Sequence, residues 1–315
     1  MIYIILLPVF VVVMLFYFRV ANYYNIIDRP NERSSHSTVT IRGGGIIYLV
    51  AALFAVFMEQ AYWLSIVGLL LIGLISFLDD RMTISSKLRI LIHLIAVTFL
   101  FISLGLFQMF SWPLILGFYI LVIGIINAYN FMDGINGITG SYSLVILLGL
   151  LYINTCQIAF IQVNLIIIPI LASLVFLFFN FRKTAKCFAG DVGSVALAFW
   201  IIWLLLTLML NTGNYIYILF LGVYGVDSIL TIIHRLMRKE NIFLAHRLHF
   251  YQILANEQKI PHLIVSSMYT VIQALIITLV IFSNLNWIIL SLISLLPMIL
   301  IYIILKPRLM IHVKK

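Results

Sequence analysis

Long apolar stretches separated by short polar breaks make up nearly the whole chain. Most of them are close to the ~20 residues that an α-helix needs to cross the hydrocarbon of a membrane. The eleven stretches cover residues 2–18, 43–58, 62–78, 90–107, 112–128, 141–154, 163–180, 192–210, 215–233, 263–283 and 286–305. The pattern lacks the alternating segments of about 10 residues that are typical of transmembrane β-barrels. It predicts an all-α integral membrane protein, a polytopic bundle of about 11 transmembrane helices.

Composition supports a membrane protein and excludes an ordinary soluble domain. Of the 315 residues, 64% are hydrophobic and 9% are charged, whereas soluble domains carry roughly 25% charged residues. We expect a single transmembrane domain over residues 1–315, in which the stretches at 43–58 and 141–154 are short for a span. The first stretch has no positive n-region and is followed by Arg19, so it is interpreted as a first membrane helix with its N-terminus outside rather than as a cleavable signal.

Lysine and arginine indicate the orientation, because they concentrate in cytoplasmic loops. All nineteen lie in the segments 19–42, 81–89, 182–186, 235–259 and 306–315. With eleven spans, these are odd-numbered loops and the C-terminal tail, all on one side. The cytoplasmic loops are therefore predicted at 19–42, 79–89, 127–140, 181–191 and 234–262. The same bias accounts for the net charge of +9, so no nucleic-acid partner is inferred.

The acidic residues gather on the same face. Glu59 alone of the ten acids is predicted outside, and Asp227 lies inside the ninth span. The acids at cytoplasmic helix ends are Asp79, Asp80, Asp133 and Asp191. Carboxylate oxygens that act together with substrate phosphates suit Mg²⁺, whereas Zn²⁺ would need closely spaced His and Cys. Cys156 and Cys187 fall on opposite sides of the membrane and cannot pair. The arrangement predicts a magnesium site of the kind that supports phosphoryl transfer.

Two acidic motifs have structural alternatives. Asp79 and Asp80 could share a cation or raise each other's pKa, or they could form a solvated helix end paired with Arg81. Function is favoured, since negative charge at a helix C-terminus opposes the helix dipole. Asp191, between Gly190 and Gly193, could simply be the N-cap of the eighth span. A helix N-terminus is also an anion site, so capping and catalysis are compatible.

The stretch NFMDGINGITG at 130–140 places glycines at every third position beside Asp133. Such spacing allows backbone to approach a phosphate or sugar closely, and a plain turn would need fewer glycines. Neutral donors and acceptors are added by Asn127, Asn130 and Asn136. We expect this loop to contact substrate.

Two basic loops are open to more than one interpretation. His246, Arg247 and His249 could contact a pyrophosphate, or the loop could lie along the lipid headgroups as ordinary positive-inside sequence. The GGG after Arg42 could ease close helix packing. His93 on the fourth span is interpreted as a pore-lining or packing residue.

The motifs together resemble a known family, the polyprenyl-phosphate N-acetylhexosamine-1-phosphate transferases (glycosyltransferase family 4). The resemblance covers about residues 28–252. It is carried by RSSH at 33–36, RGGG at 42–45, FLDDR at 77–81, NFMDGINGITG at 130–140, FAGDVGS at 188–194 and AHRLHFYQ at 245–252. The HR-x-H-x-YQ form is more similar to the branch that initiates O-antigen or capsular polysaccharide.

The resemblance implies an enzyme in the bacterial inner membrane with its site on the cytoplasmic face. In the implied reaction, undecaprenyl phosphate attacks the β-phosphorus of a UDP-N-acetylhexosamine and UMP is released, with Mg²⁺ or Mn²⁺ as cofactor. Implied catalytic residues are Asp79, Asp80 and Asp133, and implied metal ligands are Asp191 and Asp80. Implied substrate-binding residues are Arg42, Lys87, Asn127, Asn130, Asn136, His246, Arg247 and His249.

One position departs from the family pattern, because Asn136 stands where a second aspartate is usual. Asn keeps an oxygen ligand and loses a charge, so metal or uridine contact is expected to be weaker. The hexosamine and the oligomeric state stay open, a homodimer included. The main alternative function is a secondary transporter or lipid flippase, which would place ionisable residues near the midplane in repeated halves. The acids here cluster at one face instead.

Overall fold

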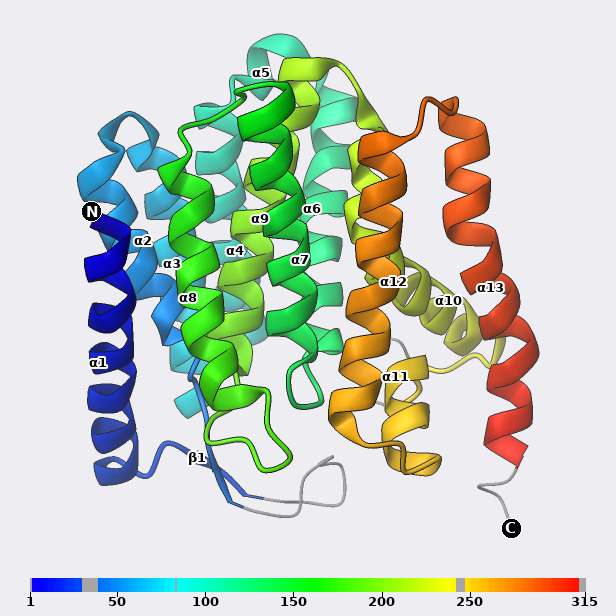
Figure 1. Cartoon of the computed structure of the whole chain (residues 1–315), viewed down its shortest axis with the longest axis horizontal. Helices are drawn as coiled ribbons and strands as arrows, with labels where there is room; N and C mark the ends of the chain where they lie inside the picture. The colour runs from blue at the N-terminus through cyan, green and yellow to red at the C-terminus, as the bar shows by residue number, and fades with distance from the viewer. Residues whose placement is uncertain (1, 30–38, 83, 242–246, 312–315) are drawn as a thin grey trace.

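The computed structural model describes residues 2–29, 39–82, 84–241 and 247–311. Within these ranges the protein is a bundle of mostly parallel and antiparallel helices with one small two-stranded sheet (Figure 1). The α-helices are α1 (Ile2–Tyr23), α2 (Ile46–Met58), α3 (Trp63–Arg81), α4 (Ser86–Ser103), α5 (Leu106–Met109), α6 (Trp112–Met132), α7 (Ile138–Tyr152), α8 (Asn164–Asn180), α9 (Gly190–Thr212), α10 (Gly222–Met237), α11 (Phe250–Gln252), α12 (His262–Phe282) and α13 (Trp287–Ile311). Short 3₁₀ or π segments are η1 (Gln60–Tyr62), η2 (Ile153–Gln157), η3 (Tyr215–Leu221) and η4 (Ile253–Glu257).

The prediction of an all-α membrane protein is confirmed, and each predicted apolar stretch corresponds to a helix. Nine helices among the described residues are long and apolar enough to cross a membrane. The two shorter ones are α2 and α8, with 13 and 17 residues. At 1.5 Å per residue they cover only about 20 and 25 Å, less than the ~30 Å of a hydrocarbon core. The stretch at 141–154 is not short, because η2 continues α7 to Gln157.

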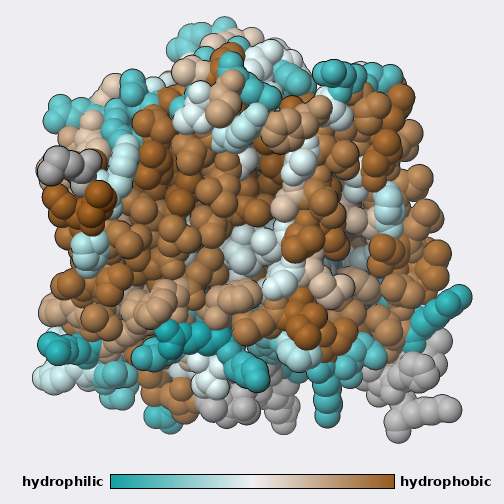
Figure 2. Space-filling model, in the orientation of Figure 1, coloured by the Kyte–Doolittle hydropathy of each residue, from teal (hydrophilic) through white to brown (hydrophobic). Residues whose placement is uncertain are grey.

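The surface has the polarity that a membrane protein requires. Figure 2 shows a broad apolar band across the middle of the face in view, with hydrophilic residues gathered at its two ends. The sheet, the loop between α6 and α7, the loop between α8 and α9, and α11 all lie at the lower end of Figure 1, together with the C-terminus. The glycine-rich loop therefore shares one end of the molecule with the basic loops, although it carries no basic residue itself.

Helix α9 forms the centre of the bundle. It is apolar on all sides, as expected of a helix that other helices surround. Within its most apolar 18 residues, 94% are buried inside the protein. It packs against α2, α3, α6 and α7. Trp200 and Trp203 are fully buried, and the indole of Trp200 donates a hydrogen bond to the carbonyl of Leu165 on α8. The residues at the N-terminus of α9 thus start from a rigid, central position.

The small sheet fixes the first loop to the start of α9. Strands β1 (Ile27–Asp28) and β2 (Thr40–Ile41) pair antiparallel, with Ile27 opposite Ile41. Beyond β2 the chain runs beside the segment that precedes α9: the Phe188 N–H donates to the Ile41 carbonyl at 2.8 Å, and the Gly44 N–H donates to the Phe188 carbonyl at 2.7 Å. Residues 33–36, which belong to the family pattern, lie outside the described residues.

The last helix differs from the prediction. We expected the final span to stop at 305 and Lys306 to belong to a cytoplasmic tail, but α13 continues to Ile311 and Lys306 is buried on it. Helix α13 packs against α10, which runs obliquely at the right of Figure 1. Hydropathy alone places a lysine outside a span, and here Tyr302 on α13 and Thr231 on α10 provide its partners instead.

Candidate active site

The carboxylate of Asp80 lies against the N-terminus of α9. Asp80 belongs to the last turn of α3, and its Oδ1 and Oδ2 accept hydrogen bonds from the backbone N–H groups of Asp191 at 3.1 Å and Val192 at 3.2 Å. These N–H groups have no partner inside the helix, and the positive end of the helix dipole favours an anion there. The alternative interpretation of Asp191 as the N-cap is therefore wrong, because Asp191 lies in the first turn of α9 and Asp80 supplies the cap from another helix.

Arg42 links Asp80 with Asp191. Its Nε lies 2.8 Å from Asp80 Oδ1, and one terminal nitrogen lies 3.9 Å from Asp191 Oδ1. The side chain of Asp80 is 0% exposed and that of Asp191 is 25% exposed, so Asp191 has the oxygens that a ligand can reach. Burial lowers the pKa of Arg42, but the carboxylates of Asp80, Asp191 and Asp28 outweigh it and raise the pKa above its usual value. The guanidinium stays charged.

Glycine is required where these segments meet. Gly190 has φ +69°, and a Cβ there would lie 2.5 Å from Asp80 Oδ2. A Cβ on Gly45 would lie 2.0 Å from the Cα of Gly193, so α2 and α9 touch backbone to backbone. The structural interpretation of the GGG run, close helix packing, is thereby confirmed for Gly45. A side chain at either position would push the first loop or Asp80 away from α9.

Asp79 has a different partner from its neighbour. Its carboxylate pairs with Arg89 on α4, 2.5 Å away, and accepts the Ile84 N–H at 3.0 Å. The alternative pairing with Arg81 is wrong, because the Arg81 guanidinium lies over the ring of Tyr24 instead. Asp79 therefore stabilises the turn between α3 and α4. Lys87, predicted to bind substrate, is exposed in the first turn of α4.

Asp133 and Asn130, at the end of α6, lie near the N-terminus of α9. The side-chain oxygen Oδ1 of Asn130 accepts a hydrogen bond from Ser194 Oγ at 2.8 Å, and the same side chain hydrogen-bonds the Asp191 carboxylate. Asp133 ends α6. Burial raises the pKa of Asp133 to about 7, and the carboxylates of Asp191 and Asp80 contribute to the rise. Carboxylates from three separate helix ends therefore act on one another electrostatically.

The three glycines of the glycine-rich loop face protein side chains. A Cβ on Gly134 would lie 2.2 Å from the Tyr251 hydroxyl, and one on Gly137, at φ +85°, would lie 2.2 Å from the ring of Phe181. A Cβ on Gly140 would meet Leu177 at 2.8 Å. Their spacing is thus explained by close packing of this loop on α8 and α11, which differs from the predicted approach to a phosphate.

Asn136 holds the same loop in place. It is 4% exposed, and its Nδ2 donates to the carbonyls of Arg182 at 2.8 Å and Lys183 at 3.2 Å. Its own carbonyl accepts from Ser266 Oγ at 2.7 Å. A carboxylate cannot donate to two carbonyls, so the surroundings favour Asn over the usual Asp. Asn127, by comparison, donates to the Ile123 carbonyl one turn earlier on α6.

A second polar group surrounds Asp227 on α10. Its carboxylate accepts the Phe250 N–H at 2.8 Å and the Tyr269 hydroxyl at 2.7 Å, and it lies 3.4 Å from His249 Nδ1. The Tyr251 hydroxyl donates to the Phe131 carbonyl at 2.8 Å, so the His249 segment touches the glycine-rich loop. Arg247 is half-buried in this segment. His246 lies outside the described residues.

Comparison with known proteins agrees with this geometry. The sequence model described as glycosyl transferase family 4 matches residues 62–209. A probable undecaprenyl-phosphate N-acetylglucosaminyl 1-phosphate transferase of Bacillus subtilis (strain 168) is 30% identical over 259 residues, which cover 75% of this chain and 71% of the relative. The chain belongs to glycosyl transferase family 4. The resemblance inferred from the motifs is confirmed.

Other relatives in family 4 carry different substrate names. An undecaprenyl-phosphate alpha-N-acetylglucosaminyl 1-phosphate transferase of Yersinia pestis is 28% identical over 266 residues, covering 75% of this chain and 71% of its own. A phospho-N-acetylmuramoyl-pentapeptide-transferase of Streptococcus pneumoniae serotype 19F (strain G54) is 31% identical over 196 residues, covering 54% of this chain and 59% of its own. Similarity thus extends to two kinds of sugar-phosphate transferase.

The acidic group fits a magnesium ion with few protein ligands. Among the described residues, no three His, Cys, Asp or Glu side chains are placed to hold a metal ion together. Mg²⁺ needs no such cage, because it commonly takes one or two carboxylates and obtains its other ligands from phosphates and water. Among the described residues, Asp191 has only the 3.9 Å contact with Arg42, and Asp133 takes part in no ion pair. Asp80, predicted as a ligand, has both oxygens engaged by the N-terminus of α9 and Arg42.

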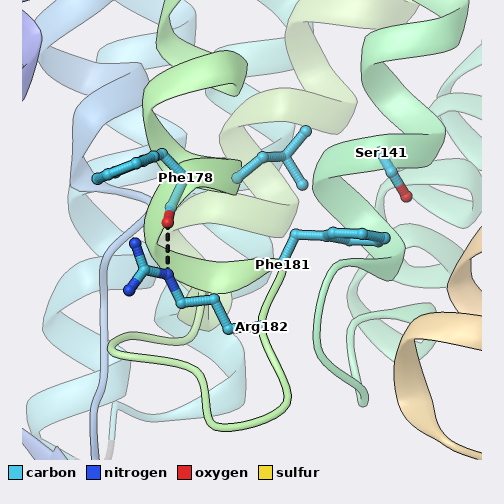
Figure 3. Close-up of a pocket in the computed structure, with 5 residues that line it drawn as sticks. Ser141, Phe178, Phe181 and Arg182 are labelled. Carbon is cyan, nitrogen blue, oxygen red and sulfur yellow. Dashed lines mark hydrogen bonds between the residues drawn. The ribbon is translucent and has the colours of Figure 1, made fainter.

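A groove lies beside the glycine-rich loop. It encloses about 450 Å³ between α7 and α8 and is lined by Ser141, Leu177, Phe178, Phe181 and Arg182 (Figure 3). The Arg182 Nε donates to the Phe178 carbonyl at 2.7 Å, and its guanidinium lies over the Phe178 ring. None of these five lining residues is acidic. Its apolar walls suit an aliphatic chain rather than a sugar nucleotide.

Two residues that the structure places at the polar end were not predicted from the sequence to have a role. Arg89 was included only among the basic residues of the segment 81–89, yet it is the partner of Asp79. Asp227 was noted as an acid inside a span without a role. A carboxylate within an apolar helix is itself a functional signal, and this signal could have identified Asp227 from the sequence. Nothing in the sequence around Arg89 indicates its partner.

Proposed function

We propose that the protein transfers N-acetylhexosamine 1-phosphate from a UDP-N-acetylhexosamine to undecaprenyl phosphate and releases UMP. The observation that carries the proposal is the meeting of Asp80, Asp133 and Asp191, from three motifs far apart in sequence, at one end of the helix bundle with Arg42. The names of the family 4 relatives support it, since they include transferases that act on undecaprenyl phosphate.

The chemistry requires two anions to approach each other. An oxygen of the acceptor phosphate forms a bond to the β-phosphorus of the donor, and the bond between that phosphorus and the bridging oxygen breaks, so that the electron pair leaves with UMP. A phosphate is nucleophilic at neutral pH, and little proton transfer is needed. The main obstacle is charge repulsion, which fixed positive groups lower.

We assign a role to each residue according to how exposed its side chain is and what it contacts. Asp191, with Asp133 beside it, would hold Mg²⁺, or Mn²⁺ in its place, and the bound ion supplies positive charge to the phosphates. Arg42 adds a fixed cation whose direction Asp80 sets through the 2.8 Å contact. Asp79 holds the turn between α3 and α4 through Arg89. His249 and Arg247 lie on the segment that we assign to the sugar nucleotide.

The polar end that carries this group is proposed to face the cytoplasm of a bacterium. Lysine and arginine concentrate there, as in cytoplasmic loops generally. The proposed donor, a UDP-sugar, would reach the site from the cytoplasm. The prenyl chain would remain in the bilayer of the inner membrane while its phosphate reaches the helix ends. We further propose that the product initiates a cell-surface polysaccharide, O-antigen or capsule, because of the HR-x-H-x-YQ form of the basic motif.

The direct test uses the purified protein in nanodiscs with undecaprenyl phosphate and a panel of UDP-N-acetylhexosamines. We expect UMP release with at least one donor, only when Mg²⁺ or Mn²⁺ is present. Asp191→Asn should reduce the rate by about a hundredfold or more, the size of effect typical of a lost electrostatic group. Glu59→Gln, at the opposite end of the bundle, is the matched control and should retain the rate. Absence of UMP release from the wild-type protein with every donor would reject the proposal.

A further inference from the structure

The last helix carries a buried lysine. Lys306 on α13 is 2% exposed, and its ammonium group donates to the Tyr302 hydroxyl and, at 3.4 Å, to Thr231 Oγ1 on α10. A charged amine within a membrane helix is costly, and ionisable residues at such positions commonly have a function and a partner. The reaction proposed above makes no use of Lys306.

Two hydroxyl groups connect Lys306 with the Asp227 carboxylate. The Tyr302 hydroxyl lies 2.7 Å from Thr231 Oγ1, which lies 3.2 Å from Asp227 Oδ1. A hydroxyl donates once and can accept as well, so one direction satisfies the whole series: the lysine donates to Tyr302, Tyr302 donates to Thr231, and Thr231 donates to Asp227. The four residues are all buried, and a cation at one end of such a network balances the anion at the other.

At the other end of this network, Asp227 orders the backbone of the basic motif. The N–H groups of Phe250 and Tyr251 donate to its carboxylate at 2.8 and 3.3 Å, and His249 Nδ1 lies 3.4 Å away. A further contact joins the same region to α13, because Gln258 Nε2 donates to the Leu309 carbonyl at 3.2 Å. The position of residues 249–251 therefore depends on α10 and α13 as well as on their own turn.

We propose that Lys306 is a positioning residue for the His249 segment, acting through Tyr302, Thr231 and Asp227. The ammonium group balances the buried carboxylate and keeps it directed at the backbone of residues 249–251. His249 is thereby held beside Phe131, whose ring centroid lies 6.2 Å from that of the imidazole. The proposal rests on the proposed function in one respect, the assignment of this segment to the sugar nucleotide.

Removing the charge should loosen the segment. In Lys306→Met the carboxylate stays buried and the network that reaches it through Tyr302 and Thr231 loses its ammonium group, so residues 249–251 should spend less time in the ordered position. The apparent affinity for a ligand falls with the fraction of protein that is competent to bind. We expect the KM for the UDP-sugar to rise about tenfold with a smaller change in kcat, the pattern of lost ground-state binding. Hydrogen exchange of the Phe250 and Tyr251 amides should become at least about tenfold faster, because these amides lose their ordered acceptor.

Companion variants keep the test decisive if Lys306→Met folds poorly. Tyr302→Phe removes only the connecting hydroxyl and should speed the same two amides. Lys306→Arg retains the charge and should restore part of the protection. Arg308→Gln changes an exposed charge on the same helix and should leave exchange and KM unaltered. In an Asp227→Asn background, Lys306→Met should have a smaller effect on exchange than in the wild type, as expected of coupled residues.

Unchanged exchange at Phe250 and Tyr251 in folded Lys306→Met and Tyr302→Phe would overturn the proposal, whatever the activity. The exchange measurement needs no substrate, so it decides the proposal even if the wild-type protein releases no UMP. Faster exchange without a rise in KM in an active enzyme would also overturn it, since the segment would then have no part in donor binding.

Discussion

The carboxylate of Asp80 caps the helix that begins beside Asp191, at 3.1 Å from the Asp191 N–H. The acidic motif at the end of α3 thus caps the helix of a second motif more than a hundred residues away in sequence. The capped end is also where Asp191 presents its more exposed carboxylate. Capping by Asp80 and ligand binding by Asp191 are therefore parts of one arrangement, and changes that disturb the cap should also disturb the proposed reaction.

Gly190→Ala should disrupt this arrangement. The added Cβ would lie 2.5 Å from Asp80 Oδ2, at a residue with φ +69°. The substitution would therefore cause a steric clash and place a side chain on a left-handed backbone conformation. Misplacing a reacting group by about 1 Å can cost about a hundredfold in rate, and we expect a loss of UMP release of at least that size. Gly213→Ala is the matched control: φ is +65° with nothing within 4 Å of the added Cβ. It should cost only roughly 1–2 kcal/mol of strain and leave the rate intact. Equal rates in the two variants would contradict the cap model.

Arg42→Gln should lower stability and activity together. It leaves the fully buried Asp80 carboxylate without its cation, and a buried group deprived of its partner costs about 1–3 kcal/mol. The thermal unfolding midpoint in detergent should fall, and UMP release should fall with it. Combining Arg42→Gln with Asp80→Asn should destabilise less than the sum of the single changes, because the two side chains share one contact at 2.8 Å. Strict additivity would show that the pair does not interact in solution.

Asn136→Asp should weaken the protein although it restores the residue usual in the family. The Nδ2 donates to the carbonyls of Arg182 and Lys183, and a carboxylate in its place would face two acceptors. We expect a loss of about 1–3 kcal/mol, measured as a lower unfolding midpoint, with reduced UMP release. Asn214→Asp is the control, since the Asn214 oxygen only accepts the Ile216 N–H and Asp can do the same. A gain of activity in Asn136→Asp would refute this account.

The two cysteines test the orientation of the bundle. Cys156 is exposed in η2 and Cys187 is buried before α9. Burial raises the pKa of Cys187 to about 12, and since the thiolate is the reactive form, Cys187 should resist maleimides in the folded protein at neutral pH. A membrane-impermeant maleimide added to intact spheroplasts should label Cys156 alone, and Cys156→Ser should remove the label. Labelling of Cys156 only after the cells are opened would reverse the proposed orientation.

Much of the architecture follows from local pattern. Apolar residues in runs of helix length must be covered by lipid or by other helices, so the positions of the membrane helices could be predicted without knowledge of their packing. Clustering of charge at one face followed from the distribution of lysine and arginine. The acidic and glycine-rich motifs could be recognised individually because their residues are adjacent in the chain.

The partners of those residues depended on packing. Asp80 and Asp79 are neighbours in sequence, yet one caps α9 and the other pairs with Arg89 on α4, because adjacent residues on a helix point in different directions. The glycines of the loop at 133–137 meet Tyr251 and Phe181, which no spacing within the loop could indicate.

By itself, the sequence determined that the chain is a helical membrane protein of one recognisable family, with its acids at one end. These conclusions rest on hydropathy, short motifs and the distribution of charge along the chain, which can be read without knowledge of the packing. The tertiary structure alone decided which carboxylate is buried, which is accessible, and why Lys306 lies inside the last helix rather than beyond it. These outcomes depend on contacts between helices distant in the chain, where burial and pairing together set the free energy of each charge.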